Sequence, residues 1–181
     1  GLASNFGLEY IPGPWMESIQ VSKGTSSVIN GYEATTGQIN VEYLKPQKAN
    51  PIALNLFMNS EFRTEVNATG GWNINNKLST GVMAHYKNEG MEMDSNHDGF
   101  MDLPKSNQIN LLNRWNYKSG NYTGQILVRG LYDERRGGQM TKLALTNPYN
   151  IAIDTKRIDA IMKNGYVFDP EKGTSIGVIV S

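Results

Sequence analysis

Residues 65–87 read EVNATGGWNINNKLSTGVMAHYK, and two alternating runs meet at Asn75-Asn76. In both runs an apolar or small residue alternates with an amide, hydroxyl or charged residue. Side chains of a β-strand point to opposite faces with period two, so each run predicts a strand with one apolar and one polar face. The asparagine pair between the runs predicts a tight turn. This segment is therefore expected to form two neighbouring antiparallel strands.

The same alternation recurs in three further segments, Pro51–Phe62, Gln108–Lys118 and Tyr122–Tyr132, with Asn113 as an exception on the apolar side. The connections alternate in length. Those at Asn75-Asn76 and Ser119-Gly120-Asn121 are short, and those expected at Asn88–Asn107 and Asp133–Thr174 are long. Antiparallel strands would place the short turns at one end of the sheet and the long loops at the other. The expected fold class is all-β, mainly antiparallel.

Two architectures fit this pattern. In an outer-membrane barrel the apolar face meets lipid, with aromatic residues at both ends of the strands. The sequence places them so: Trp72, Tyr117 and Tyr122 beside the short turns, Tyr86 and Tyr132 beside the long loops. In a soluble antiparallel sandwich the same apolar face would form the interior. The alternation alone does not separate the two.

The segment before Pro51 differs in composition and in the length of its alternating runs. Two short alternating runs, Ile19–Lys23 and Gln38–Leu44, flank a connector rich in glycine and hydroxyl residues. A phosphate-binding P-loop is excluded, because neither Gly24 nor Gly31 is followed by lysine and a hydroxyl residue in the required order.

The connector and its flanks resemble the end of the plug domain of TonB-dependent outer-membrane receptors. The likeness is ordered, from Pro14-Trp15 through the two runs to Val41. Its motif positions are Lys23, Gly24, Ser26, Ser27, Gly31, Tyr32 and Gly37. Lys23 stands where the family often has arginine, and Gln38 where a second glycine is common. These departures resemble a receptor subgroup from Bacteroidetes and leave the substrate in doubt.

The resemblance implies a domain organisation. Residues 1–47 would be the carboxyl-terminal part of the plug, and residues 48–181 the amino-terminal part of the transmembrane barrel with its extracellular loops. Arg135–Ser181 is expected to be a long outer loop followed by the beginning of a further strand. A transporter barrel of roughly 22 strands needs many more than this chain supplies, so the chain is expected to be a fragment.

The family function implied is energised uptake of a scarce ligand, such as a metal chelate, cobalamin or a glycan. The implied partners are a TonB-type energising complex, a small ligand and outer-membrane lipid, and the implied location is the bacterial outer membrane. Catalysis is not expected, because the histidines, His85 and His97, lie among polar residues without a recognisable nucleophile, base and acid spacing. We therefore expect a transporter segment and not an enzyme.

The first long connection contains a candidate calcium loop. Oxygen ligands recur at positions 1, 3, 5 and 9 of this loop, with Gly99 at position 6. The ligands would be Asp94, Asn96, Asp98, Asp102 and the backbone carbonyl of Phe100. Position 12 is Lys105 and not glutamate, so Glu89 or Glu92 would have to substitute. Calcium is thus a candidate cofactor, against a plain polar loop. A soluble calcium-stabilised β-rich binding module is the alternative function.

Composition excludes several other classes. The chain carries 17 basic and 17 acidic residues with a pI near 6.9, which leaves no basic footprint for nucleic acid. It contains no cysteine, which excludes disulfides and thiolate-ligated metals. No apolar run is as long as a transmembrane helix requires, whereas membrane-crossing strands need only alternation.

Overall fold

The computed structural model describes residues 7–25, 37–143 and 146–181. Within these ranges the chain forms strands and a few short 3-10 helices. The 3-10 helices are η1 (Gly7–Tyr10), η2 (Gly13–Trp15) and η4 (Thr141–Leu143). The strands are β1 (Met16–Lys23), β2 (Gly37–Tyr43), β3 (Ala53–Met58), β4 (Thr64–Asn73), β5 (Leu78–Glu89), β6 (Lys105–Ser119), β7 (Tyr122–Gly138), β8 (Asn150–Asp169) and β9 (Thr174–Val180).

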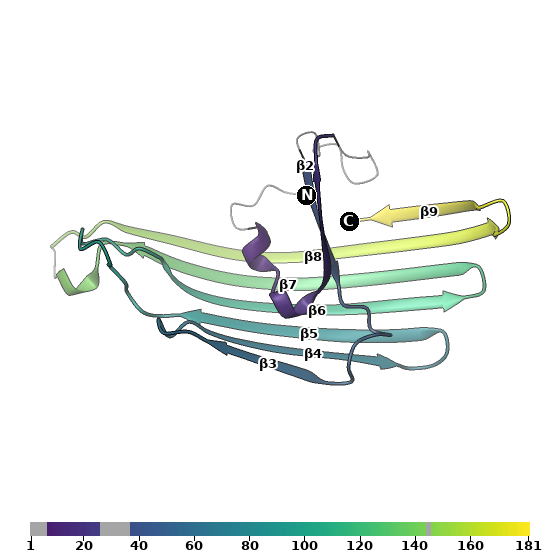
Figure 1. Cartoon of the computed structure of the whole chain (residues 1–181), viewed down its shortest axis with the longest axis horizontal. Helices are drawn as coiled ribbons and strands as arrows, with labels where there is room; N and C mark the ends of the chain where they lie inside the picture. Colours follow the sequence, from purple (N-terminus) through teal and green to yellow (C-terminus); the bar gives the residue numbers. More distant parts are fainter. Residues whose placement is uncertain (1–6, 26–36, 144–145) are drawn as a thin grey trace.

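The strands form two antiparallel sheets (Figure 1). β1 pairs with β2, with Lys23 opposite Gly37. The second sheet has seven strands in sequence order, from β3 to β9, and every neighbouring pair is antiparallel. The predicted fold class, all-β and mainly antiparallel, is confirmed.

The three turns β4–β5, β6–β7 and β8–β9 lie together at one end of the large sheet, and the two longer connections lie at the other end, as the sequence predicts (Figure 1). The β4–β5, β6–β7 and β8–β9 turns lie at one end, where Asn75 Oδ1 accepts hydrogen bonds from the backbone N–H groups of Lys77 and Leu78. The β5–β6 and β7–β8 connections lie at the other end, together with the β3–β4 turn. We call these the short-turn edge and the long-loop edge.

The prediction of a long loop over Asp133–Thr174 is wrong. β7 continues to Gly138, and β8 is a strand of 20 residues that begins at Asn150, so the connection between them is much shorter than predicted and β9 follows after a turn. The prediction that most of Arg135–Ser181 is one outer loop is wrong for the same reason. Charged residues within β8 disguise its alternation, and in the sheet they pair across strands, as Asp159 does with Arg129 at 2.8 Å. Such pairs stabilise neighbouring strands.

The first predicted strand, Pro51–Phe62, is shorter in the structure. β3 ends at Met58, and Asn59 closes a turn by accepting the backbone N–H groups of Glu61 and Arg63 on its side-chain oxygen. Phe62 takes a φ of 57° in this turn, which no strand residue adopts. The alternation of apolar residues thus extends past the end of the paired strand.

The two faces of the large sheet have opposite exposure. We call the side that bears the predicted apolar residues the apolar face, and it is exposed. Its exposed large side chains include Leu54, Leu56, Trp72, Val82, Tyr86, Ile109, Leu111, Trp115, Tyr117, Tyr122, Ile126, Val128, Ile158, Met162, Tyr166, Ile176 and Val178. The segment from η1 to β1, with residues 43–49, lies across the other side, the polar face (Figure 1). In the described part of the chain, no helix is long and apolar enough to cross a membrane.

Candidate functional site

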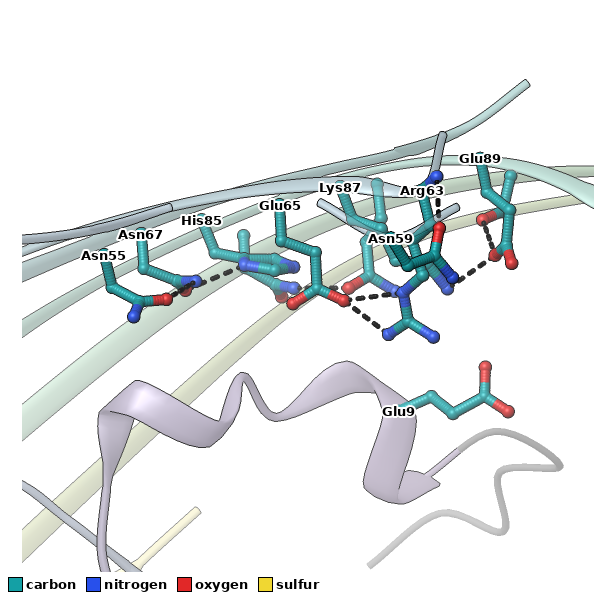
Figure 2. Close-up of polar contacts among 12 residues, drawn as sticks. Glu9, Asn55, Asn59, Arg63, Glu65, Asn67, His85, Lys87 and Glu89 are labelled. Carbon is teal, nitrogen blue, oxygen red and sulfur yellow. Dashed lines mark hydrogen bonds and ion pairs between the residues drawn. The ribbon is translucent and has the colours of Figure 1, made fainter. Parts of the chain in front are cut away.

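The candidate site is the polar face beneath the amino-terminal segment. Its side chains come from neighbouring strands in register and point toward η1 and η2 (Figure 2). The buried polar and charged members are Asn67, His85, Lys87, Gln108, Asn110, Arg114, Arg129, Asp133 and Arg135. Charged side chains are rarely buried unless they are paired, so their partners define what this face does.

An amide row crosses the first strands of the sheet. Asn55, Asn67 and His85 stand opposite one another on β3, β4 and β5. Asn67 Nδ2 donates to Asn55 Oδ1 at 3.5 Å, and His85 Nδ1 lies 2.8 Å from Asn67 Oδ1 (Figure 2). With Asn67 Oδ1 as acceptor, His85 Nδ1 carries the proton. This row is a set of satisfied hydrogen bonds, which suits a packed polar interface.

Ion pairs occupy the part of the polar face nearer the long-loop edge. Arg63 pairs with Glu65, and Lys87 Nζ lies 3.1 Å from a Glu89 carboxylate oxygen (Figure 2). Further across the sheet, Asp133 is fully buried and accepts from Arg135 Nε at 2.8 Å. Gln108 Nε2 donates to the second Asp133 oxygen at 3.3 Å. Pairing explains how Lys87, Asp133 and Arg135 remain buried.

Trp15 anchors the amino-terminal segment. Its side chain is fully buried and packs with Met83, Leu112 and Leu127, which are apolar residues set within the polar face. The Trp15 ring also meets His85 edge to face, with ring centroids 6.4 Å apart. Because a buried tryptophan removes a large apolar area from water, this contact dominates the packing between segment and sheet.

Two arginines of the sheet hold the chain at the end of β2. Arg114 donates from one terminal nitrogen to the carbonyl oxygens of Tyr43 at 2.9 Å and Leu44 at 3.3 Å. Arg129 donates to the Tyr43 hydroxyl at 3.1 Å and pairs with Asp159. Bonds from a charged donor are stronger than neutral ones, and these fix the segment in register with the sheet.

A third arginine holds η1. Arg135 pairs with Glu9 at 2.7 Å and with Asp133 at 2.8 Å. Between η1 and the sheet lies a cavity of about 500 Å³, whose charged lining includes Glu9, Glu65, Lys87 and Arg135. The segment is thus packed tightly at Trp15 and more openly at η1, on the side toward the long-loop edge.

Two glycines let the chain cross the polar face closely. A Cβ on Gly71 would lie 2.5 Å from the Pro46 carbonyl oxygen, and one on Gly81 would lie 3.2 Å from the Pro46 ring. The Gly71 distance leaves no room for a side chain where backbone meets backbone, and the Gly81 distance is tighter than an ordinary van der Waals contact. The two glycines therefore form a recess that receives the linker between β2 and β3.

The predicted plug motif is only partly described. Lys23 ends β1, and Gly24 follows with a φ of 82°, a conformation that glycine adopts readily. Gly37 begins β2, where a Cβ would lie 3.0 Å from the Ser22 carbonyl oxygen. Ser26, Ser27, Gly31 and Tyr32 lie outside the described residues. The three described positions lie at the connector end of the β1–β2 hairpin, opposite the Met16–Tyr43 end that leads to the polar face.

The candidate calcium loop folds around its own side chains. Asp94 accepts from the backbone N–H groups of Asp98 and Gly99, at 3.1 and 3.2 Å, and Asp98 accepts from that of Phe100 at 2.8 Å. Asp102 accepts from the Ser95 N–H at 2.7 Å, which lowers the pKa of its carboxyl group. Asn96 Oδ1 also lies 3.2 Å from the Asp98 N–H.

The donor chemistry of this loop fits calcium, which prefers carboxylate and amide oxygens. However, among residues 7–25, 37–143 and 146–181 no three histidine, aspartate or glutamate side chains are grouped to hold a metal. The named oxygens instead satisfy backbone N–H groups. Calcium binding by Asp94, Asn96, Asp98, Phe100 and Asp102 stays a prediction.

The sequence alone does not predict that arginines hold the amino-terminal segment. The period-two alternation places Arg114 and Arg129 on the polar face. Their partners, Tyr43 and Leu44, lie about 70 to 86 positions earlier in the chain, so the local pattern does not reveal them. The available signal in the sequence is the presence of arginine on an otherwise amide-rich face.

Comparison of the chain with protein-family models, curated proteins and solved structures gives no match.

Proposed function

We propose that this chain is part of a TonB-dependent outer-membrane transporter, in which residues 1–47 belong to the plug and residues 48–181 to the barrel wall. In this proposal the polar face lines the lumen, the apolar face meets lipid, and the long-loop edge faces outward. The function is energised uptake of a scarce ligand, a metal chelate, cobalamin or a glycan.

The observation that carries the proposal is the inverted burial of the large sheet. Asp133 and Asn110 are fully buried under the amino-terminal segment, while Leu56 and Ile158 on the other face are 75% and 83% exposed. A sheet in water buries its apolar face, whereas a wall between lipid and a plugged lumen buries its polar one. The alternating short and long connections add support.

The arrangement suggests how the segment would act. A transporter has to hold its plug firmly at rest and release it when it is pulled. The contacts of the amino-terminal segment differ in tightness in a way that suits both needs. Trp15 and the arginine bonds to Tyr43 and Leu44 form a tight anchor, while Glu9 and Arg135 close a more open cavity near the outward edge. In our proposal a TonB-type complex pulls on the plug and the open part yields first. The chain transforms no substrate.

The test is the size and location of the native polypeptide. An antibody against residues 19–43 would be used on fractionated source cells, with solubilisation by detergent as the second readout. A band in the outer-membrane fraction, several times longer than this chain, supports the proposal. A soluble band of this length contradicts it.

The alternative, a soluble calcium-stabilised binding module, rests on the Asp94–Asp102 loop. It predicts that the purified chain melts cooperatively in water and that EDTA lowers its melting temperature. The matched control is Asp98→Asn, which removes one carboxylate charge and should abolish the EDTA effect. A chain that is insoluble without detergent, with melting unaffected by EDTA, contradicts the alternative and leaves the receptor proposal in place.

A further inference from the structure

A buried titratable side chain, His85, touches the anchor of the amino-terminal segment. It is 5% exposed, and its ring meets the Trp15 indole edge to face, with the two ring planes at 83°. The indole N–H of Trp15 is buried and forms no hydrogen bond with the described residues, so packing alone holds this side chain. A change in the charge or tilt of His85 would therefore reach the anchor directly.

Hydrogen bonding leaves one nitrogen of His85 free to take up a proton. Asn67 Nδ2 donates to Asn55 Oδ1, so the Asn67 oxygen faces His85 Nδ1, which carries the proton of the neutral ring. Nε2 forms no hydrogen bond with the described residues. The cavity of about 500 Å³ is lined by His85 and not by Asn67, so it borders the side of the ring that bears Nε2 (Figure 2). A proton can reach Nε2 through this cavity.

The charges around His85 give little support to a positive charge on its ring. Glu65 on β4 faces it, but this carboxylate is already paired with Arg63. Lys87, two residues further along β5, repels a second cation, and Asn110, opposite His85 on β6, is uncharged. The remaining charged groups of the cavity are Glu9, Glu89 and Arg135, which are ion-paired.

The balance of these effects favours the neutral ring. Burial lowers the pKa of His85 below its ordinary value of 6.5, and the Lys87 and Arg63 charges act in the same direction against Glu65. When the segment leaves the sheet the ring meets water, so the released state binds the proton more tightly. The hold is therefore complete above about pH 6.5 and weakens as the pH falls below this value.

We propose that His85 is an acid-sensitive contact that controls release of the amino-terminal segment: protonation at Nε2 turns the ring away from Trp15 toward the cavity and loosens the segment from the sheet. This goes beyond the proposed function, which supplies a pull on the segment but no chemical condition for its release. It also applies to the segment and sheet whether or not they belong to a transporter.

The test measures how firmly the segment is held at each pH. Nitroxide labels are placed at Ser22→Cys on β1 and Lys118→Cys near the short-turn edge, both exposed, in the polypeptide that contains this chain, with any other cysteines replaced. Pulsed electron paramagnetic resonance gives a narrow distance distribution for a held segment and a broad one for a released segment. His85→Gln takes up no proton, and its amide can still donate to Asn67. His97→Gln, in the exposed β5–β6 connection, is the matched control.

We expect the released fraction to rise about tenfold between pH 8 and pH 5 in the unchanged protein and in His97→Gln, and to stay constant in His85→Gln. A distribution independent of pH in the unchanged protein, or the same rise in His85→Gln, would overturn the proposal. A segment held more firmly at pH 5 would also overturn it, because it would mean that charged His85 forms a cation–π contact with Trp15.

Two charge variants distinguish a titrating role of His85 from a purely structural one. Glu65→Gln removes the carboxylate that favours the charged ring, and should move the midpoint of release to lower pH. Lys87→Met removes a repelling cation, and should move the midpoint to higher pH. Midpoints that stay together contradict the proposal. A polypeptide found outside the outer membrane contradicts the proposed function and leaves these expectations unchanged.

Discussion

The two faces of the large sheet are built from the same strands but solve opposite problems. The polar face is covered, and its charges are buried in pairs such as Asp133 with Arg135. The apolar face is uncovered, with Val128 and Leu111 about half exposed. Period-two alternation produces both faces at once, so what distinguishes them is the surroundings each one requires. Four changes would break or sharpen this contrast.

The largest effect is expected from Trp15→Ala, which empties the anchor on the polar face. Loss of a fully buried tryptophan should lower the free energy of unfolding by about 3–5 kcal/mol. Urea unfolding of the folded chain measures it, with proteolysis of the linker at residues 46–52 as a second readout. Ile19→Ala is the control, because Ile19 is 54% exposed on β1 and should cost little. Equal costs for both would contradict the anchor.

Val128→Lys tests the apolar face. If this face meets lipid, a lysine near the middle of β7 should cost about 2–4 kcal/mol in a bilayer. Thr123→Lys, on the polar face of the same strand, should change stability by less than about 0.5 kcal/mol. Folding yield and unfolding in lipid vesicles measure both. If Val128→Lys is as mild as the control, the apolar face does not meet lipid.

A pair of glycines compares the faces directly. In Gly71→Ala the new Cβ meets the Pro46 carbonyl oxygen, a backbone atom that moves only with the linker. We expect a loss of about 1–3 kcal/mol. Gly130→Ala should be neutral or slightly stabilising, since nothing lies within 4 Å. Thermal unfolding of the two variants side by side measures the difference, and a Gly71→Ala as stable as Gly130→Ala would argue against the recess.

The smallest effect concerns the long-loop edge. Glu92 accepts from Lys105 at 2.7 Å and from the Thr141 backbone N–H at 2.9 Å, which lowers its pKa to about 2. A lowered pKa means that the carboxylate stabilises the folded loops fully above about pH 4.5, and this contribution disappears as the pH falls toward 2.

Hydrogen exchange at residues 139–143 measures this pH dependence. Protection should fall between about pH 4.5 and 2, and Glu92→Gln should show the lower protection already at neutral pH. Glu171→Gln, in the exposed β8–β9 turn at the opposite edge, is the control. If the protection factors at residues 139–143, taken relative to the intrinsic exchange rate at each pH, stay constant in the unchanged protein, Glu92 does not stabilise these loops.

Particular segments show what could be predicted. Residues 65–87 carry a clean alternation, and the structure places β4 and β5 there with the expected turn. β8 was missed because Asp154 and Lys156 fall on one face and Arg157 and Asp159 on the other, so no phase of the alternation stays apolar. Some of those charges find partners across strands, as Arg136 Nη1 does with Asp154 at 2.8 Å, while Arg157 pairs with Asp159 along the same strand.

By itself the sequence determined the strand class, the antiparallel order and the residues assigned to each face of β3 to β7, because period two and turn residues are local properties. Only the tertiary structure decided which face is buried and by what. Trp15 meeting Met83, and Arg114 meeting the carbonyl oxygens of Tyr43 and Leu44, join residues roughly 70 positions apart. Such contacts depend on how the amino-terminal segment crosses the sheet, and the local alternation of residues does not predict that crossing.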